Sequence, residues 1–155
     1  MQRNLWEATK SLLVVFNYES DEQLRDFRVS LDRMLNNSKV ERLIIVVNVP
    51  KELDKNTLPP HFLIYYNSPN DFTFFGKLKD IQLEAELARS YDVLIWFGST
   101  DQKSFPIVAQ TPVRRRIIVN EEQADFDLQF NAENPAPGAL LEFVIQTLQK
   151  IAIYE

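Results

Sequence analysis

Short apolar runs without polar alternation recur along the chain, and each is closed by a polar turn. There are five of them: Leu12–Phe16, Leu43–Val47, Phe62–Tyr66, Val93–Phe97 and Ile117–Val119. Runs this short and this rich in Val, Ile and aromatic residues are typical of strands that are buried on both faces. Because two-sided burial requires helices above and below the sheet, the pattern predicts a three-layer α/β domain.

The segments between these runs have the spacing of amphipathic helices. The first helix is predicted to begin after Ser20, because Ser20 and Gln23 have the spacing of a capping box. Its apolar stripe consists of Leu24, Phe27, Leu31 and Leu35. Three further helices are predicted over Leu78–Ser90, Asp101–Gln110 and Gly138–Ile153. Since Pro106 fits best in a first turn, the second of these three is expected to begin late, near Ser104.

Two segments depart from a regular alternation of strand and helix. Lys51–Pro60 is polar and too short for a full crossover, so no ordinary packed helix is expected between the second and third strands. Asp127–Asn131 alternates, which predicts a sixth, shorter strand at an edge. The elements together predict one domain over residues 1–155, with a doubly wound, mostly parallel sheet of five or six strands. A Rossmann-like or flavodoxin-like topology is expected, and no motif fixes the strand order.

The composition is typical of a globular protein. Of the 155 residues, 45% are hydrophobic and 25% are charged, and the net charge is −5. This acidic balance disfavours nucleic acids and anionic membranes as partners. The chain has no cysteine, no signal-like apolar core near its start and no apolar stretch approaching the roughly 20 residues of a membrane span. A cytoplasmic protein is therefore expected.

One basic cluster, Arg114–Arg116, stands at the start of the fifth strand. Strand alternation predicts that Arg114 and Arg116 lie on one side of the sheet and Arg115 on the other. Two interpretations stay open for this cluster. It is either charge that protects the entry of an edge strand or a phosphate-binding patch.

No motif for catalysis, cofactor binding or metal binding is found. The chain has three glycines and no glycine-rich phosphate loop, which argues against the usual dinucleotide and P-loop sites. His61 is the only histidine, and it stands at the start of a strand, away from the edge where α/β sheets bind ligands. We therefore predict no catalytic residues, no cofactor and no metal, and we favour a protein that is not an enzyme.

Five strands end in polar residues, and in a parallel sheet such residues converge on one edge: Asn17, Asn48, Asn67, Ser99 and Asn120. The candidate ligand-binding residues there are Asn17, Tyr18, Glu19, Asn67, Gly98, Ser99, Thr100 and Asp101. Ser99 or Thr100 is suited to cap the next helix, whose N-terminus would attract anions. One interpretation is a polar crevice for a nucleotide or a phosphosugar-like molecule, and the other is a set of ordinary strand terminators and helix caps.

Three aromatic residues, Phe72, Phe74 and Phe75, lie close together in a loop outside the strands. Rings in this position are buried in the core, in a partner or in a ligand pocket. Trp6 is a further candidate for a partner contact. The open alternatives are a homodimer interface through this aromatic loop and simple packing of the rings on the helix that follows.

Several segments resemble a family of small bacterial α/β proteins of unknown function, found mainly in Bacteroidetes. They are Phe74–Lys77, Tyr91–Ile95, Val113–Ile118, Asp125–Leu128 and the helix Leu141–Ile151. The resemblance covers about half of the chain and implies an α/β fold without an assigned activity. The leading hypothesis is thus a non-catalytic cytoplasmic binding or interaction module. The alternative is a small-molecule binding protein or an enzyme that uses the polar crevice.

Overall fold

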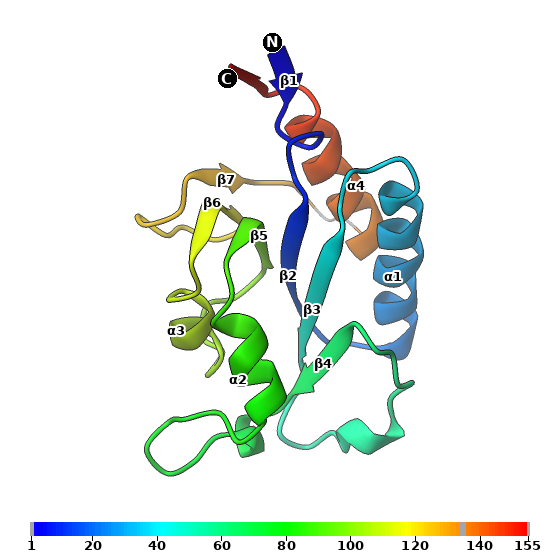
Figure 1. Cartoon of the computed structure of the whole chain (residues 1–155). Helices are drawn as coiled ribbons and strands as arrows, with labels where there is room; N and C mark the ends of the chain where they lie inside the picture. Colours follow the sequence, from blue (N-terminus) through cyan, green and yellow to red (C-terminus); the bar gives the residue numbers. More distant parts are fainter. Residues whose placement is uncertain (1, 134–135, 155) are drawn as a thin grey trace.

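The computed structural model describes residues 2–133 and 136–154, and its centre is a six-stranded, wholly parallel sheet (Figure 1). The strands are β2 (Ser11–Asn17), β3 (Arg42–Asn48), β4 (Ile64–Asn67), β5 (Tyr91–Phe97), β6 (Val113–Val119) and β7 (Leu128–Phe130). The predicted α/β fold is confirmed, since each of the five apolar runs overlaps a strand. The sixth strand is the short edge strand expected within Asp127–Asn131.

The strands follow the spatial order β4-β3-β2-β5-β6-β7. Counted along the chain from β2, this is the order 3-2-1-4-5-6 of Rossmann folds. The flavodoxin-like alternative is wrong, because β3 and β4 both add on the same side of β2 before the chain crosses over to β5. The direction of winding reverses between β2 and β5. The carboxyl ends of these two strands therefore form the topological switch point, where sheets of this kind bind ligands.

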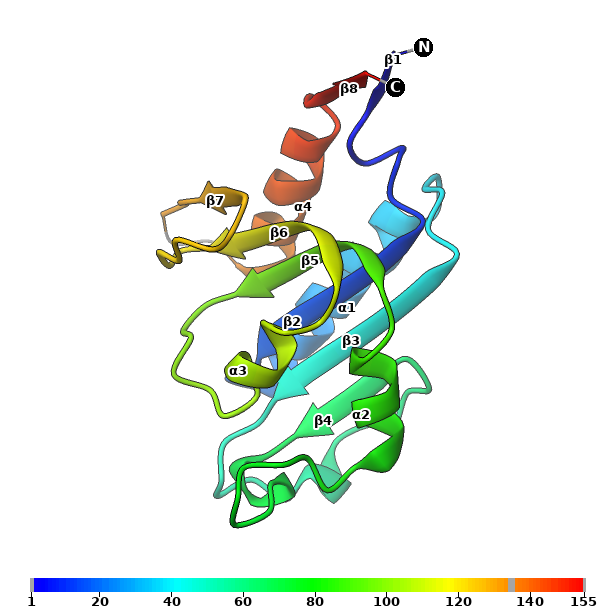
Figure 2. The same cartoon turned by 60° about the vertical axis from the view of Figure 1, so that its left-hand side comes forward.

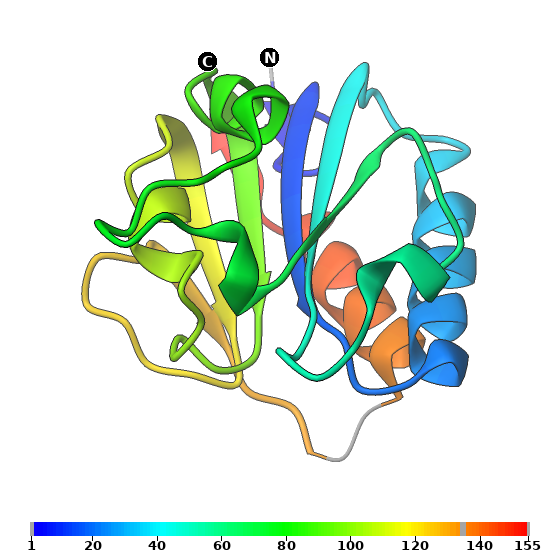
Figure 3. The ribbon, with the colours of Figure 1, turned by 90° about the horizontal axis from the view of Figure 1, so that it is seen from below.

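Helices cover both faces of the sheet (Figures 2 and 3). They are α1 (Asp21–Leu35), α2 (Ile81–Leu87), α3 (Phe105–Val108) and α4 (Pro137–Leu148). In Figure 3 the blue α1 and the orange α4 lie on one side, and the green α2 and yellow-green α3 lie on the other. As predicted, no packed helix joins β3 to β4, and this connection holds only the short 3₁₀ helix η1 (Lys55–Thr57).

Strand alternation divides the core into two halves. Leu12 and Val14 pack with residues of α1 and α4, whereas Leu13 and Val15 pack with residues of α2 and α3. All four side chains are fully buried. This two-sided burial explains why the runs carry no polar alternation.

Local polar groups set where the helices begin. The Ser20 hydroxyl accepts a 3.1 Å hydrogen bond from the Gln23 N–H, as the capping box predicts. Asp80 caps α2, so the predicted start of that helix at Leu78 is three residues too early. The third helix begins directly after Ser104 with Pro106 in its first turn, as expected.

The two ends of the chain pair with each other, which the sequence did not reveal. Strand β1 (Gln2–Asn4) and strand β8 (Ala152–Tyr154) form a small antiparallel sheet at one end of the molecule (Figure 1). The prediction of a final helix up to Ile153 is therefore wrong, because the chain leaves the helix at Leu148 and Ile153 pairs with Arg3. Among the described residues, no helix has both the length and the apolar character that a bilayer crossing requires.

Candidate functional site

A row of three asparagines closes the neighbouring strands β2, β3 and β4. Asn17 is in register with Asn48, and Asn48 is in register with Asn67. The expectation that strand-ending polar residues converge on one edge is confirmed for these positions, because the sheet is parallel. The backbone ladder continues one residue further, since the Tyr18 N–H donates to the Asn48 carbonyl at 2.8 Å.

Side chains link this row to the loop after β5. The Asn48 Nδ2 group donates to Asn17 Oδ1 at 3.0 Å, and the Ser104 hydroxyl donates to Asn48 Oδ1 at 2.7 Å. Asn48 and Ser104 are both buried. Buried polar groups with complete hydrogen bonds fix their geometry, so Asn17 is held rigidly at the switch point.

A crevice opens beside Asn17, between the carboxyl ends of β2 and β5. Its volume is about 570 Å³. Its lining is drawn from the ends of β2 and β5 and the segments that follow them, from the end of β6 and from α4: Phe16, Asn17, Tyr18, Glu19, Gln23, Phe97, Gly98, Ser99, Gln102, Asn120, Pro137 and Leu140. The crevice thus occupies the switch point and has the size of a pocket for a small molecule.

Gly98 shapes the crevice where β5 ends. Its backbone has φ +91°, a conformation that other residues rarely adopt. A Cβ atom at this position would stand 3.0 Å from Nδ2 of Asn17. Glycine is therefore required both by the turn and by the close approach of the Asn17 amide.

The tyrosine at the rim of the crevice is tied to the first turn of α1. Tyr18 donates a 2.6 Å hydrogen bond from its hydroxyl to Oδ1 of Asp21. This hydrogen bond raises the pKa of Tyr18 above its usual value, since the carboxylate stabilises the protonated phenol. Tyr18 is thus a neutral hydrogen-bonding group at physiological pH.

The charge of the crevice disfavours an anionic ligand. Glu19 is the one charged residue in its lining, and no lysine or arginine is among the residues that line it. Asp21 and Glu22 add negative charge to the first turn of α1. Amide, hydroxyl and aromatic groups can bind a neutral polar molecule, whereas this carboxylate-rich surround opposes a phosphate group.

Five of the eight predicted ligand-binding residues line the crevice. Asn67, Thr100 and Asp101 do not. Asn67 ends the edge strand β4, and two strands, β3 and β2, lie between β4 and β5. The expectation that Ser99 or Thr100 caps a helix is wrong, because α3 begins only after Ser104 and the Ser99 hydroxyl instead accepts from the Asp101 N–H at 3.1 Å.

The crevice also contains residues beyond these five. Asn120 has φ +62° just after β6, and its side-chain oxygen accepts from the Ala132 N–H at 2.9 Å. Asn120 is one of the strand-ending residues predicted to converge on this edge, and it lines the crevice. Gln102, Pro137 and Leu140 come from loops and a helix whose position depends on the whole fold, so local sequence gives no sign of them.

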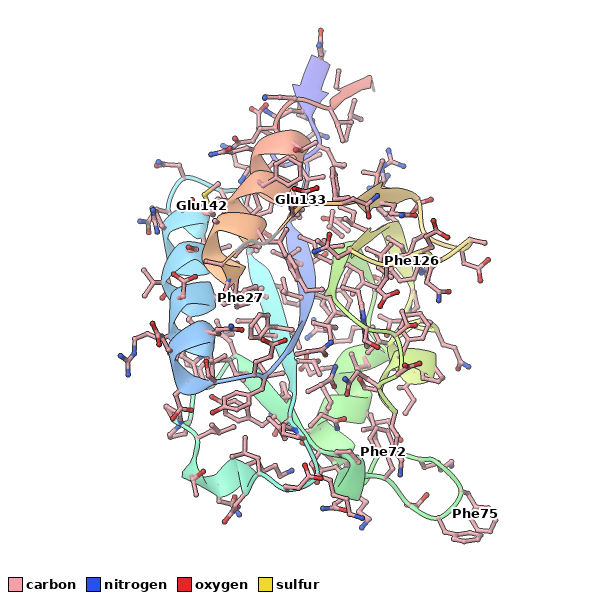
Figure 4. All side chains as sticks on the ribbon, turned by 180° about the vertical axis from the view of Figure 1, so that it is seen from behind. Phe27, Phe72, Phe75, Phe126, Glu133 and Glu142 are labelled. Atoms are coloured by element: carbon pink, nitrogen blue, oxygen red, sulfur yellow. The ribbon has the colours of Figure 1, made fainter. Side chains whose placement is uncertain are left out.

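A second candidate site is the aromatic tip, defined here as Phe74 and Phe75. Their side chains are 97% and 90% exposed, and the rings contact each other edge to face with centroids 5.4 Å apart. Figure 4 shows Phe75 at the end of a loop that extends away from the body of the protein. Exposed aromatic rings at a projecting tip are characteristic of interaction surfaces.

The loop that carries the aromatic tip is a short hairpin. Phe72 pairs with Leu78 in an antiparallel bridge, and the Thr73 N–H donates to the Lys77 carbonyl at 2.7 Å. Gly76 completes the turn with φ +83°. These contacts hold the two exposed rings in one place, which lowers the entropy cost of burying them in a complex.

Two predicted interface residues are part of the core instead. Phe72 is 8% exposed and packs with residues of α2, and Trp6 is 3% exposed and packs with the α1 and α4 side of the core. Their assignment to a partner contact is wrong. Phe72 points inward because the hairpin bridge places it at the base of the loop and Phe74 and Phe75 at its tip.

His61 and the acidic residues form no catalytic or metal arrangement in the part of the chain that the structure describes. His61 precedes β4, accepts from the Leu63 N–H at 3.1 Å through Nδ1 and stacks on Phe62. No group of three histidine, aspartate or glutamate side chains is placed to hold a metal ion among these described residues.

The chain matches no known protein-family model and no curated protein sequence. Its resemblance to small bacterial α/β proteins of unknown function therefore stays a prediction. Inferences about function rest on the chemistry of the crevice, the aromatic tip and the charged surfaces.

Proposed function

We propose that this protein is a non-catalytic interaction module that self-associates through the aromatic tip. The observation that carries the proposal is the exposure of Phe74 and Phe75 on a hairpin that is anchored by buried Phe72 and Leu78. Single exposed apolar side chains are common on protein surfaces, whereas two adjoining exposed rings form a patch of the kind found at interaction sites.

Burial of these rings supplies the free energy of the contact. Removing a phenylalanine side chain from water contributes about 1.5–3 kcal/mol. Loss of both rings should therefore weaken association by about a hundredfold or more, since each factor of ten corresponds to about 1.4 kcal/mol. Two side chains cover much less than the roughly 800 Å² per partner of a stable interface, so the contact is expected to be weak and concentration-dependent.

The charges around the aromatic tip suit a second copy of the chain. Exposed residues of both signs flank it, with Lys77 and Lys79 on one strand of the hairpin and Asp80 just beyond. Exposed Ile81 follows at the start of α2. A two-fold contact can place lysines of one copy near the aspartate of the other while the rings pack together.

Sedimentation velocity over a range of protein concentrations tests this proposal. The wild type is expected to show a mass that rises with concentration, and Phe74→Ser/Phe75→Ser is expected to stay monomeric. Phe62→Ser is the matched control, because Phe62 is 87% exposed but lies before β4 rather than on the tip. A wild type that is monomeric at every concentration, or a mass change that Phe62→Ser also abolishes, would overturn self-association through the tip.

A second candidate function is the binding of a neutral polar molecule in the crevice at the switch point. It is favoured by the position of the 570 Å³ crevice between β2 and β5 and by a lining of amide and hydroxyl groups that contains no lysine or arginine. A thermal-shift screen with uncharged sugars and nucleosides tests it, since a ligand at a hundred times its Kd adds about 2.7 kcal/mol of stability. Ser99→Trp should abolish any shift, and exposed Gln110→Trp should retain it. A shift that survives Ser99→Trp would exclude the crevice.

We propose that the protein is located in the cytoplasm. A chain of 155 residues without cysteine suits a reducing compartment, where disulfides do not contribute to stability. Fractionation of cells that express the tagged protein, followed by immunoblotting, tests this location. Recovery in a secreted or periplasmic fraction would contradict it.

A further inference from the structure

A basic pocket lies at the amino ends of the strands, opposite the crevice. Its volume is about 410 Å³. Its lining comes from the first ten residues, from the starts of β5 and β6 and from β8: Arg3, Leu5, Ala8, Thr9, Lys10, Asp92, Val93, Arg114, Arg115 and Ile153. Four cationic residues and one carboxylate therefore meet in a protein whose net charge is −5.

The carboxylate in this pocket is already engaged by the protein. Asp92 Oδ2 accepts from the Lys10 N–H at 2.8 Å and from the Ser11 N–H at 3.2 Å. Its other oxygen lies 4.0 Å from an Arg114 guanidinium nitrogen. Asp92 thus joins the starts of β2 and β5, and its negative charge is largely compensated by these groups.

Three of the cationic side chains in the pocket have N–H donors that can bind a ligand. Lys10 and Arg115 are exposed, and neither side chain forms an ion pair within the described part of the chain. Arg114 is held only by the long contact to Asp92, and its side chain is 80% exposed. Arg3 from β1 adds a further positive charge. The like charges of Lys10, Arg114 and Arg115 repel one another, so an anion that neutralises them would stabilise this arrangement.

The rest of the pocket favours a small molecule over a polymer. Leu5, Val93 and Ile153 form apolar wall next to the cations, and β1 and β8 enclose the pocket from the side of the chain termini. A guanidinium group forms paired hydrogen bonds with phosphate oxygens, and an ammonium group adds a point charge. The crevice at the opposite edge has no lysine or arginine in its lining.

We propose that the basic pocket at the amino edge of the sheet binds a phosphorylated small molecule, with Lys10, Arg114 and Arg115 holding its phosphate groups. The ligand's phosphate lies near the starts of β2 and β6, and its less polar part contacts Leu5 and Ile153. This site is independent of the aromatic tip. The experiment below also distinguishes a phosphorylated small molecule from an extended nucleic acid.

Isothermal titration calorimetry with pyrophosphate and with ADP, at low and at physiological salt, tests this site. The wild type is expected to bind one equivalent, and Lys10→Gln/Arg115→Gln is expected to bind at least tenfold more weakly. Arg25→Gln/Lys51→Gln is the matched control, because it removes the same charge from exposed positions elsewhere and should change the affinity less than twofold. Affinity should fall as salt rises, since charged contacts are screened.

Three results would overturn the proposal. One is the absence of saturable binding by the wild type for both probes. Another is equal weakening in the two double variants, which would mean that net charge rather than the pocket attracts the anion. The third is tighter binding of a single-stranded oligonucleotide than of pyrophosphate, with Lys10→Gln/Arg115→Gln affecting both, because this would assign the surface to a polymer.

Discussion

Gly98 lies directly against the side chain of Asn17, and the two residues close the neighbouring central strands β5 and β2. A Cβ atom on Gly98 would stand 3.0 Å from Asn17 Nδ2. This contact brings the ends of the two strands together at the point where the winding of the sheet reverses. It also sets the floor of the crevice, because both residues line it.

Gly98→Ala should destabilise the protein by about 1–3 kcal/mol, since the substitution adds both backbone strain at φ +91° and a close contact. Gly76→Ala is the matched control, because Gly76 has φ +83° but no atom within 4 Å of an added Cβ. Chemical denaturation measures both changes. The loss should be larger for Gly98→Ala, and adding Asn17→Ala should recover part of it. Equal losses for the two glycines would mean that the contact with Asn17 has no effect.

The sequence was a good guide wherever local pattern decides the structure. The uninterrupted run Leu12–Phe16 could only be a strand buried on both faces, and the Ser20 cap marked the start of α1 correctly. The parallel sheet followed from the alternation of such runs with helices. From that arrangement the convergence of Asn17 and Asn48 on one edge could also be predicted.

The sequence was a poor guide wherever distant segments decide the structure. Phe72 and Phe74 are two residues apart in one aromatic segment of the sequence, yet only Phe72 is buried. Its burial depends on the bridge to Leu78 and on the position of α2. The strand order depends on which strands pair, and no short motif encodes that choice. Likewise, Lys10 and Arg115 line the same pocket only because β2 pairs with β5 and β5 pairs with β6.

Ser104→Ala should destabilise the protein by about 1–3 kcal/mol, because it removes the donor to the buried Asn48 side chain. Ser99→Ala should cost less, since Ser99 is only half-buried and its hydroxyl accepts a single hydrogen bond from a neighbouring N–H. Urea denaturation of the two variants checks the difference. If Ser104→Ala is as stable as the wild type, the link between Asn48 and the loop after β5 contributes nothing to folding.

Gly138→Ala should destabilise the contact between α1 and α4, although alanine is the better helix former. The Gly138 N–H donates to Asp26 Oδ2 at 2.8 Å, and an added Cβ would stand 2.9 Å from that oxygen and would collide with Ser30 Oγ. The expected loss is about 1–3 kcal/mol by chemical denaturation. Ser30→Ala in the same chain should recover part of it. A Gly138→Ala protein that gains stability would show that the helices can separate without cost.

Tyr91 should make the stability of the protein depend on alkaline pH. It is 1% exposed, its hydroxyl donates to the Glu86 carbonyl at 2.8 Å, and burial raises the pKa of Tyr91 to about 12. The Glu86 carboxylate adds to this rise in pKa, whereas the Arg42 guanidinium, which lies over the ring, opposes it. The folded state holds the Tyr91 proton more tightly than the unfolded state. The contribution of this proton to the free energy of unfolding is therefore complete below pH 10 and is lost between about pH 10 and 12.

Tyr91→Phe should therefore lose about 1 kcal/mol at neutral pH, through the missing hydrogen bond, and should lose less stability than the wild type as the pH rises from 10 to 12. Tyr65→Phe is the control, because burial also raises the pKa of Tyr65 but Tyr65 is only half-buried. Urea denaturation at several pH values compares the three proteins, and deprotonation of lysines is common to all of them. If the free energy of unfolding falls equally with pH for wild type and Tyr91→Phe, ionisation of Tyr91 does not destabilise the folded state.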